Sequence, residues 1–318
     1  MAKVAYPGGS SSIVNKTNAD KFIPELWSDE IVAAYKKSLV LANLVNKMSM
    51  VGKKGDALHI PKPTRGSASV KAANTAVTIQ ADTESEVIVT VDKHYEYSRM
   101  IEDIVGVQAL DSMRRFYTDD AGYALATQID NDIFTLGKSL GDGDGSDWVH
   151  SNVYYMDGTN GLTAYAVDTV AAADTFSDEG FRELIKLMDD QDTPMDNRCL
   201  VIPPSARRDI LGIDRYNSSD FVDGRGVNTG LIGNLYGIDV YVSSNCPVIE
   251  TAADNAAGGD VKAGILMHKD TFVLAEQMGV RSQTQYKQEY LADLFTSDTL
   301  YGVKTLRPET GFVIALPA

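Results

Sequence analysis

The sequence has few of the residues that enzyme chemistry uses. Its 318 residues include only two cysteines, Cys199 and Cys246, without CxxC spacing, and four single histidines without HExxH or HxH spacing. These spacings exclude the common zinc motifs and favour two reduced, structural thiols. The chain has neither a P-loop nor a GxGxxG motif, and its composition gives no argument for a Ser-His-Asp triad. We predict no catalytic, cofactor-binding or metal-binding residue.

Positive charge and long apolar runs are scarce as well. Lys and Arg total 29 against 44 Asp and Glu, which gives a net charge of −15. The phosphate backbone of DNA is repelled on average by such a chain, which excludes a general DNA-binding role. No apolar run approaches the roughly 18 residues of a membrane span, and the N-terminal MAKVAYPGGSSS lacks the apolar core of a signal peptide. We therefore expect a soluble protein made in a cytoplasm.

One long helix is the strongest positive signal. Apolar residues between Ile101 and Gly137 recur at helical spacing in two stripes, which predicts a helix from about Asp111 to Gly137, about 40 Å long. Asp111 and Arg115 have the spacing of a surface ion pair. Gly122 predicts tight packing or a slight bend. The first stripe is Leu110, Met113, Tyr117, Ala121 and Ala124, and the second is Leu125, Ile129, Ile133 and Leu136.

The residues before this helix predict an arm and a hairpin. The first 20 residues are rich in Gly, Ser, Lys and Asn and predict a flexible arm. Ser28 begins an amphipathic helix that reaches about Val45 and docks on another surface. An isolated hairpin is marginal in water, so we expect the next segment to project and to lie on a neighbouring subunit or on its own domain, with hinges near Gly52 and Gly55. Its strand signals are Ala57–Pro61, Val77–Ile79 and Glu86–Tyr97. Within the last, Val87, Val89 and Val91 alternate with Ile88, Thr90 and Asp92, the period-two pattern of a half-exposed strand.

The residues after the long helix alternate between helix and strand signals. This alternation predicts a compact α/β or α+β domain from about Ser177 to Asp293. Glycines from Gly224 to Gly233 predict a mobile loop. The expected elements are short strands in Val153–Val170, a helix capped by Ser177, a strand at Cys199–Ile202, a helix from Pro203 to about Leu211, and strands at Ile238–Val242, Gly264–Met267, Thr271–Leu274, Tyr301–Leu306 and Gly311–Leu316.

An acidic run follows the long helix. Asp142, Asp144, Ser146 and Asp147 in GDGDGSDW resemble the opening of a calcium loop. The position of the closing bidentate Glu holds Val153, and the required glycine is misplaced. A solvated acidic loop and a calcium site both stay open, and the sequence favours the first.

The order of these parts resembles a tailed-phage major capsid protein of the Hong Kong 97 type. The resemblance is carried by FIPELWSDEIVAAYKKSLVLANLV (Phe22–Val45), EVIVTVDKHYEYSRMIEDI (Glu86–Ile104) and LYGVKTLRPETGFVIAL (Leu300–Leu316). It implies the α+β fold of that family. The implied parts are an N-terminal arm at 1–47, an extended hairpin loop at 48–100, a peripheral domain with a spine helix at 101–176 plus 294–318, and an axial domain at 177–293 whose axial loop is Gly212–Gly233.

The resemblance also implies a function and partners. The chain would self-assemble through pentamers and hexamers into the icosahedral head shell of a tailed double-stranded DNA bacteriophage, in the virion, after synthesis in the host cytoplasm. The implied partners are copies of itself, a separate scaffolding protein, a portal, decoration proteins and packaged DNA without sequence-specific binding; no membrane is implied. Because only a short arm precedes the first helix, we expect no cleaved scaffolding region. We predict no cross-link, although Lys53, Lys54, Lys62 and Lys71 lie in the hairpin loop.

Two other functions compete with this interpretation. An encapsulin-like bacterial nanocompartment has the same architecture and would carry enzyme cargo instead of a genome. An acidic cytosolic hydrolase or a calcium-dependent binding module belongs to a different class, and a monomer with an enclosed polar pocket would favour it.

Overall fold

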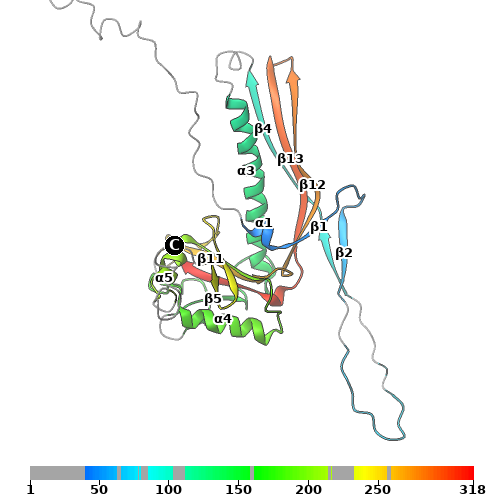
Figure 1. The fold of residues 1–318 in the computed structure, drawn as a ribbon, viewed down its shortest axis with the longest axis vertical. Helices are drawn as coiled ribbons and strands as arrows, with labels where there is room; N and C mark the ends of the chain where they lie inside the picture. The colour runs from blue at the N-terminus through cyan, green and yellow to red at the C-terminus, as the bar shows by residue number, and fades with distance from the viewer. Residues whose placement is uncertain are drawn as a thin grey trace, which may run out of the picture.

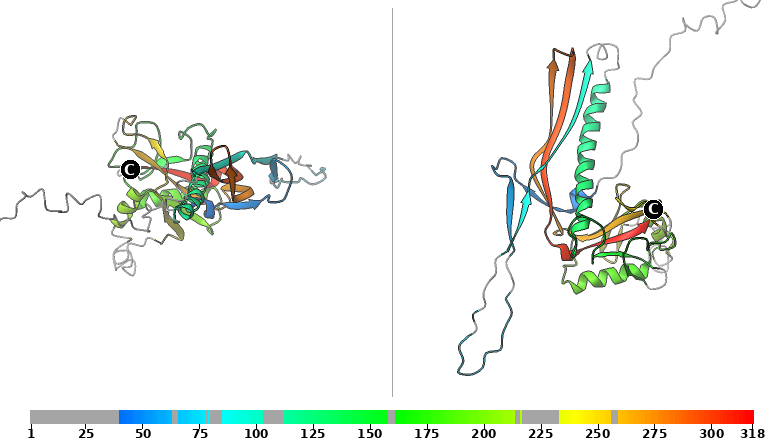
Figure 2. Two further views of the ribbon diagram at one scale, coloured as in Figure 1. Left: turned by 90° about the horizontal axis from the view of Figure 1, so that it is seen from above. Right: turned by 180° about the vertical axis from the view of Figure 1, so that it is seen from behind.

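The computed structural model describes residues 40–62, 66–77, 79, 85–102, 112–157, 161–213, 216, 233–255 and 259–318. Three predictions lie largely or wholly outside these residues: the docking helix before Val40, the Asp111–Arg115 ion pair, and the glycine-containing loop within Gly212–Gly233. Within the described part, one helix and three long strands (residues 93–102, 112–135, 272–287 and 292–305) form an elongated unit that we call the blade. The blade stands on a compact lower part that contains a second sheet, and a hairpin projects beside both (Figures 1 and 2).

The predicted long helix is confirmed. α3 spans Ser112–Thr135 and continues into a short 3-10 helix, η3, at Leu136–Ser139. Leu125 and Ile133 of the second stripe are buried, and Ile129 packs against the same core cluster as Ile133. Of the two alternatives predicted at Gly122, tight packing is wrong, because a Cβ built there meets no atom within 4 Å; the slight bend stays a prediction.

A four-stranded sheet runs along α3 (Figure 1). Its order is β1-β12-β13-β4; β1 pairs with β12 in parallel and the other pairs are antiparallel. The sequence predicted only the first residues of β12 and the last of β13, since the distal parts of these strands are mostly exposed and lack an apolar period. The bounds are β1 Asn46–Ser49, β4 Lys93–Glu102, β12 Phe272–Lys287 and β13 Ala292–Thr305.

The lower part contains a second, eight-stranded sheet. Its order is β6-β5-β14-β11-β7-β9-β8, and β10 pairs with β11. The strands predicted at 199–202, 238–242, 264–267 and 311–316 are all confirmed here, as are short strands within 153–170. The bounds are β5 Val153–Tyr155, β6 Thr163–Ala164, β7 Arg198–Ile202, β8 Asn234–Leu235, β9 Ile238–Val242, β10 Val248–Glu250, β11 Val261–His268 and β14 Gly311–Pro317.

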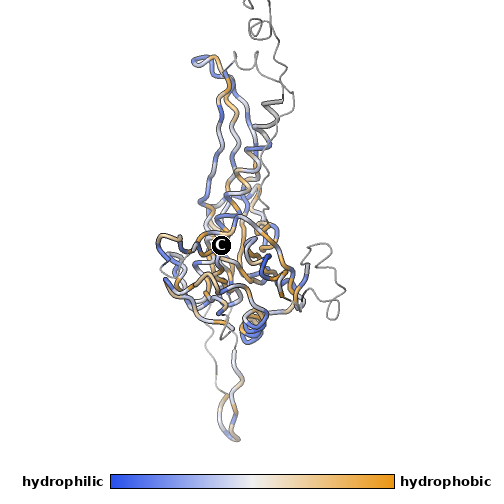
Figure 3. The backbone as a smooth tube through the Cα atoms, turned by 90° about the vertical axis from the view of Figure 1, so that its left-hand side faces the viewer, coloured by the Kyte–Doolittle hydropathy of each residue, from blue (hydrophilic) through white to orange (hydrophobic). Residues whose placement is uncertain are grey.

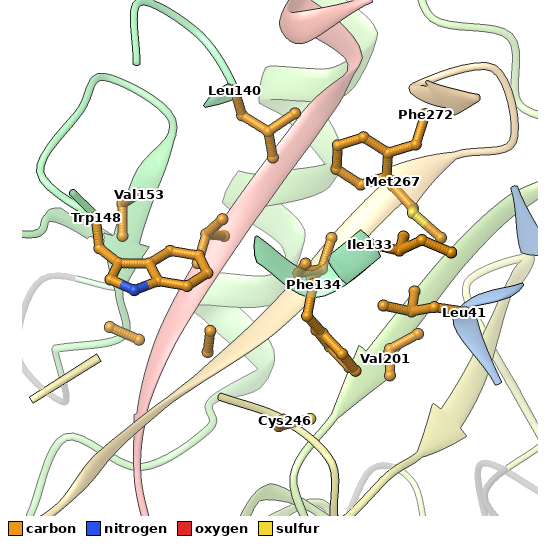
Figure 4. Close-up of a cluster of buried hydrophobic side chains, with 14 of the residues drawn as sticks. Leu41, Ile133, Phe134, Leu140, Trp148, Val153, Val201, Cys246, Met267 and Phe272 are labelled. Carbon is orange, nitrogen blue, oxygen red and sulfur yellow. The ribbon is translucent and has the colours of Figure 1, made fainter. Parts of the chain in front are cut away.

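Both faces of this sheet are buried, which explains its nearly continuous apolar strands. Leu200 and Ile202 of β7 face one cluster with α4 (Asp178–Asp190) and α5 (Pro204–Leu211). Cys199 and Val201 face the other, where the end of α3 and the short helix α1 (Leu41–Leu44) pack; Figure 4 shows Ile133, Phe134 and Leu41 in this second cluster. The predicted cap of α4 is confirmed, because Ser177 Oγ accepts a hydrogen bond from Gly180 N.

The projecting hairpin consists of β2 (Ala57–Lys62) and β3 (Ser85–Thr90), paired antiparallel as a separate sheet. Val89 is buried whereas its neighbour Ile88 is 42% exposed, so the predicted alternation is confirmed. Val77 and Ile79 lie outside any strand, so the strand predicted there is wrong. Val89 and Val91 pack with Val273 and Ala275 of β12, which attaches the root of the hairpin to the four-stranded sheet.

Candidate functional site

The acidic loop uses its carboxylates internally. Asp144 Oδ1 accepts hydrogen bonds from Ser146 N and Oγ at 2.8 and 2.6 Å, and Asp142 Oδ1 accepts one from Ser151 N at 2.7 Å. These hydrogen bonds lower the pKa of both carboxyls. Within the described ranges no three His, Cys, Asp or Glu side chains gather so that they could hold a metal ion. The geometry favours a loop that stabilises its own turns.

The two thiols are poor nucleophiles. Cys199 and Cys246 are both buried and unpaired with each other. Burial raises the pKa of each thiol to about 12, so almost no thiolate forms at neutral pH. The structure therefore gives them a packing role, as their sequence spacing predicted.

One serine motif was overlooked in the sequence. Residues 137–141, GKSLG, have the spacing of the GxSxG nucleophile motif. That motif needs a sharp strand-to-helix turn, whereas Ser139 ends η3 and its Oγ donates to Leu136 O and contacts Thr305 Oγ1. His150 Nε2 contacts the Gly137 carbonyl oxygen instead of the serine. The hydrolase interpretation gains no support from this arrangement.

Two buried aspartates near the end of α3 join the blade to the lower part. Asp130 is fully buried; its Oδ1 accepts from Leu41 N at 2.9 Å and its Oδ2 from Asn245 Nδ2 at 3.2 Å. The pKa of the Asp130 carboxyl is raised, because its burial outweighs the opposing effect of these hydrogen bonds. Asp132 Oδ2 accepts from the Tyr301 hydroxyl at 2.7 Å and lies 3.1 Å from Lys93 Nζ. This joint was not predicted from the sequence, where its signal is two aspartates that lie beside Ile129 and Ile133 of the second apolar stripe.

An ion cluster fixes three strands of the blade. Arg281 Nε and Nη2 of β12 donate to the Asp298 carboxylate of β13 at 2.7 and 2.9 Å. His94 Nε2 of β4 lies 3.0 Å from the same carboxylate. The hydrogen bonds from Arg281 and then His94 lower the pKa of Asp298 to about 2. The blade is therefore held by cross-strand pairing where it has little core.

Both extensions carry exposed apolar side chains, as the lower part does at Val167 and Met195. The loop of the hairpin carries Val70, Val77 and Ile79, which are 101%, 67% and 89% exposed. The far end of the blade carries Tyr290 and Leu291, which are 63% and 64% exposed. Figure 3 shows both extensions far from the hydrophobic centre of the lower part. Side chains in such positions have no core of their own to join, which is typical of surfaces that meet another chain.

Comparisons with known proteins agree on one family. A family model described as phage capsid protein matches residues 65–311. No curated protein matches the chain in sequence. No helix in the described segments is long and apolar enough to cross a membrane.

Solved structures with a similar fold cover nearly the whole chain. The structure titled "Mycobacterium phage Che8" is 23% identical, covers 92% of this chain and 97% of its own, and has a TM-score of 0.72. The capsid of cyanophage P-SCSP1u is 18% identical, covers 99% of both chains and has a TM-score of 0.74. The capsid of cyanophage Pam1 is 14% identical, with 99% coverage of both and a TM-score of 0.67. These matches confirm the α+β fold predicted for the chain, that of Hong Kong 97-type capsids.

Proposed function

Since this chain belongs to the phage capsid protein family, we propose that it is the major subunit of the icosahedral head of a tailed, double-stranded DNA phage. Family membership makes it a structural protein of the virion and not an enzyme. Beyond family membership, we propose that the shell is icosahedral, encloses the genome and assembles through pentamers and hexamers. The alternative of a cargo-carrying nanocompartment differs in what the closed particle contains.

The placement of exposed apolar residues carries this proposal. The lower part buries its own core on both faces of a sheet and exposes single apolar side chains such as Met195, and the hairpin loop and the blade end expose apolar side chains far from that core. Copies of one chain that meet through such unlike surfaces form heterologous contacts, which generate closed rings when the rotation between neighbouring copies closes. Rings of this kind are the units from which a closed shell is built.

We further propose a division of the chain into four parts. The arm is 1–47, the extended loop 48–100, and the axial and peripheral domains follow. The sequence placed the second axial boundary at Asp293, between β12 and β13. These strands pair along most of their length and share a sheet with β4, so we place the boundary near Thr271 and assign both strands to the peripheral domain.

The proposed partners are other shell components. A separate scaffolding protein, a portal and decoration proteins would act during or after assembly, and packaged DNA would be enclosed without sequence-specific contacts. The net charge of −15 supports weak adhesion to DNA. We also propose that the shell is held without covalent cross-links, so denaturing gels of purified particles should show only monomers; a ladder of covalent oligomers would contradict this.

Negative-stain electron microscopy with size-exclusion chromatography tests the function. The chain, expressed alone or with the scaffolding protein of its gene cluster, should form closed particles, and packaged DNA would distinguish a phage head from a nanocompartment. Val70→Lys or Leu291→Lys should leave a folded subunit that does not close shells, because a charge then replaces an apolar contact. Met195→Lys is the matched control, since Met195 is 75% exposed but lies on neither extension. A wild-type subunit that stays monomeric with its scaffold would refute the proposal.

A further inference from the structure

A surface pocket of about 400 Å³ opens in the lower part, between the acidic loop and β10. Its exposed rim combines apolar and polar side chains, whereas its floor is buried. Val149, Val167 and Val248 are 47%, 57% and 44% exposed and lie around it. Trp148 and Tyr165 line it too and are each less than one-tenth exposed. Three exposed valines around one hollow are a surface that is better covered than solvated.

The floor of the pocket contains a carboxylate with one poorly satisfied oxygen. Glu250 is 7% exposed; its Oε1 accepts a hydrogen bond from Asp168 N at 3.0 Å, and its Oε2 is shielded from water and makes no hydrogen bond of good geometry within the described residues, although the Tyr165 hydroxyl lies close enough to interact with the carboxylate. A buried carboxylate oxygen without a good hydrogen bond is costly because the interior has a low dielectric constant. A positive charge in the pocket would offset that cost.

The pocket's own cation is already engaged. Lys138 Nζ donates to Ser146 O at 3.0 Å and lies 5.7 Å from the centre of the Trp148 ring. The lining also includes Asp147 and Asp254, so carboxylates outnumber this single ammonium group. The pocket therefore favours a ligand that combines an apolar portion with a positive charge, as a lysine beside apolar residues does.

The N-terminal residues of the chain have this chemistry. Residues 1–19 contain Lys3 and Lys16 and no acidic residue, although the whole chain has a net charge of −15. Apolar residues lie within two positions of each lysine in the sequence, notably Val4 and Val14. The segment is thus complementary in charge and in polarity to the pocket.

The chain also enters the described structure near the pocket. Leu41 N and Asn245 Nδ2 bind the same Asp130 carboxylate, and Asn245 lies three residues before β10, which carries Val248 and Glu250. Val40 and Ile249 pack against one core cluster. The 20 residues from 20 to 39 can span up to about 65 Å when extended, so residues 1–19 can reach the pocket.

We propose that the pocket receives residues 1–19 of this chain, from the same subunit or from a neighbour. Apolar residues of the segment cover the valine rim, and a lysine ammonium group stands opposite Glu250. The N-terminal segment is then a latch on the lower part.

Disulfide trapping in the full chain tests this inference. Val14→Cys is combined with Val248→Cys, and the cysteines are oxidised mildly both in soluble subunits and in closed particles. The native thiols are buried and remain inert. A faster-migrating monomer on a non-reducing gel indicates a link within one chain, and covalent oligomers indicate a link to a neighbour; both support the proposal. Val14→Cys with Met195→Cys is the control for random collisions, because Met195 is exposed and does not line the pocket.

Charge variants test the role of the carboxylate. Glu250→Gln, or Lys3→Gln with Lys16→Gln, should reduce the trapped fraction about ten-fold at equilibrium, the factor that corresponds to about 1.4 kcal/mol. Glu289→Gln, an exposed residue beyond the end of β12, should change nothing. Trapping no greater than in the Met195→Cys control, in subunits and in particles alike, would overturn the inference and leave the pocket to another occupant such as a decoration protein. Because soluble subunits are tested too, this result is distinct from a failure to form shells.

Discussion

At Gly302 the hairpin root crosses the four-stranded sheet at close range. This glycine lies in β13, is buried, and faces the chain where β3 ends at Thr90. A Cβ built on Gly302 would lie 2.1 Å from Thr90 O, 2.9 Å from Thr90 C and 3.1 Å from Val91 Cα. All three obstacles are main-chain atoms, so no side chain can rotate away. Gly302→Ala should therefore displace the hairpin.

The size of the effect follows from this geometry. The backbone at Thr90 must move away by about 1 Å before the distance between its carbonyl oxygen and the new Cβ reaches 3.0 Å, below which real Cβ contacts are essentially never seen. Overpacking of this kind typically costs about 1–3 kcal/mol, and we expect the upper end because two strands must separate. The small cluster beneath the hairpin, which includes Val89 and Val273, would loosen with it.

Urea unfolding and hydrogen exchange of soluble subunits measure the two consequences. The free energy of unfolding should fall by about 3 kcal/mol, and amide protons of β2 and β3 should exchange faster than those of β7. Shells should close poorly because displacement of the hairpin changes the direction in which its loop projects. Gly302→Ala with wild-type stability, wild-type exchange in β2 and β3, and normal shells would refute this reasoning.

Three further predictions concern stability. Gly122→Ala should raise the free energy of unfolding by about 1 kcal/mol, since the helix gains a better helix former and the methyl group meets nothing; an unchanged or lower value in urea would contradict this. Asp130→Ala should cost about 2 kcal/mol by stranding the buried donors of Leu41 and Asn245, whereas Asp130→Asn keeps an acceptor and should cost less, a difference that the same assay measures. The pKa of Asp298 is lowered from 3.8 to about 2, so its contribution is present above pH 4 and lost as the pH falls toward 2; Arg281→Gln should destabilise at pH 7 but hardly at pH 2, and an equal effect at both would exclude the charge mechanism.

The local elements were predictable because their signals are local. The cap at Ser177, the proline at the start of α5 and the period of α3 each act within a few residues of the chain, and all three elements formed where the sequence placed them. β7 and β9 were predictable for the related reason that buried strands are short apolar runs. The packing prediction at Gly122 failed because a glycine within a helix does not by itself indicate close packing, and here no atom lies near the position of a Cβ.

The long strands of the blade depend on partners that are distant in the sequence. β4 pairs with β13 about 200 residues away, and β1 pairs in parallel with β12 at a similar separation. Their mostly polar distal residues show no period that would identify a strand, because the pairing is held by backbone hydrogen bonds and by ions such as Asp298. The exposed apolar residues of the two extensions were only partly predictable as well. The hairpin could be predicted from its sequence, but the exposure of Tyr290 follows only from the pairing of the blade strands.

The division between a self-sufficient lower part and two dependent extensions links folding to assembly. The lower part buries Phe181, Leu200 and Ile314 within one subunit, so it can hold its shape before any neighbour arrives. The described residues of the hairpin loop bury almost nothing, as the full exposure of Val70 shows, so apolar burial at these residues depends on surfaces that other chains supply. A subunit built in this way can wait in solution as a folded body and gain its remaining apolar burial in the shell. Stability that is added only by neighbours makes closure of the particle cooperative, because each added copy completes contacts for those already present.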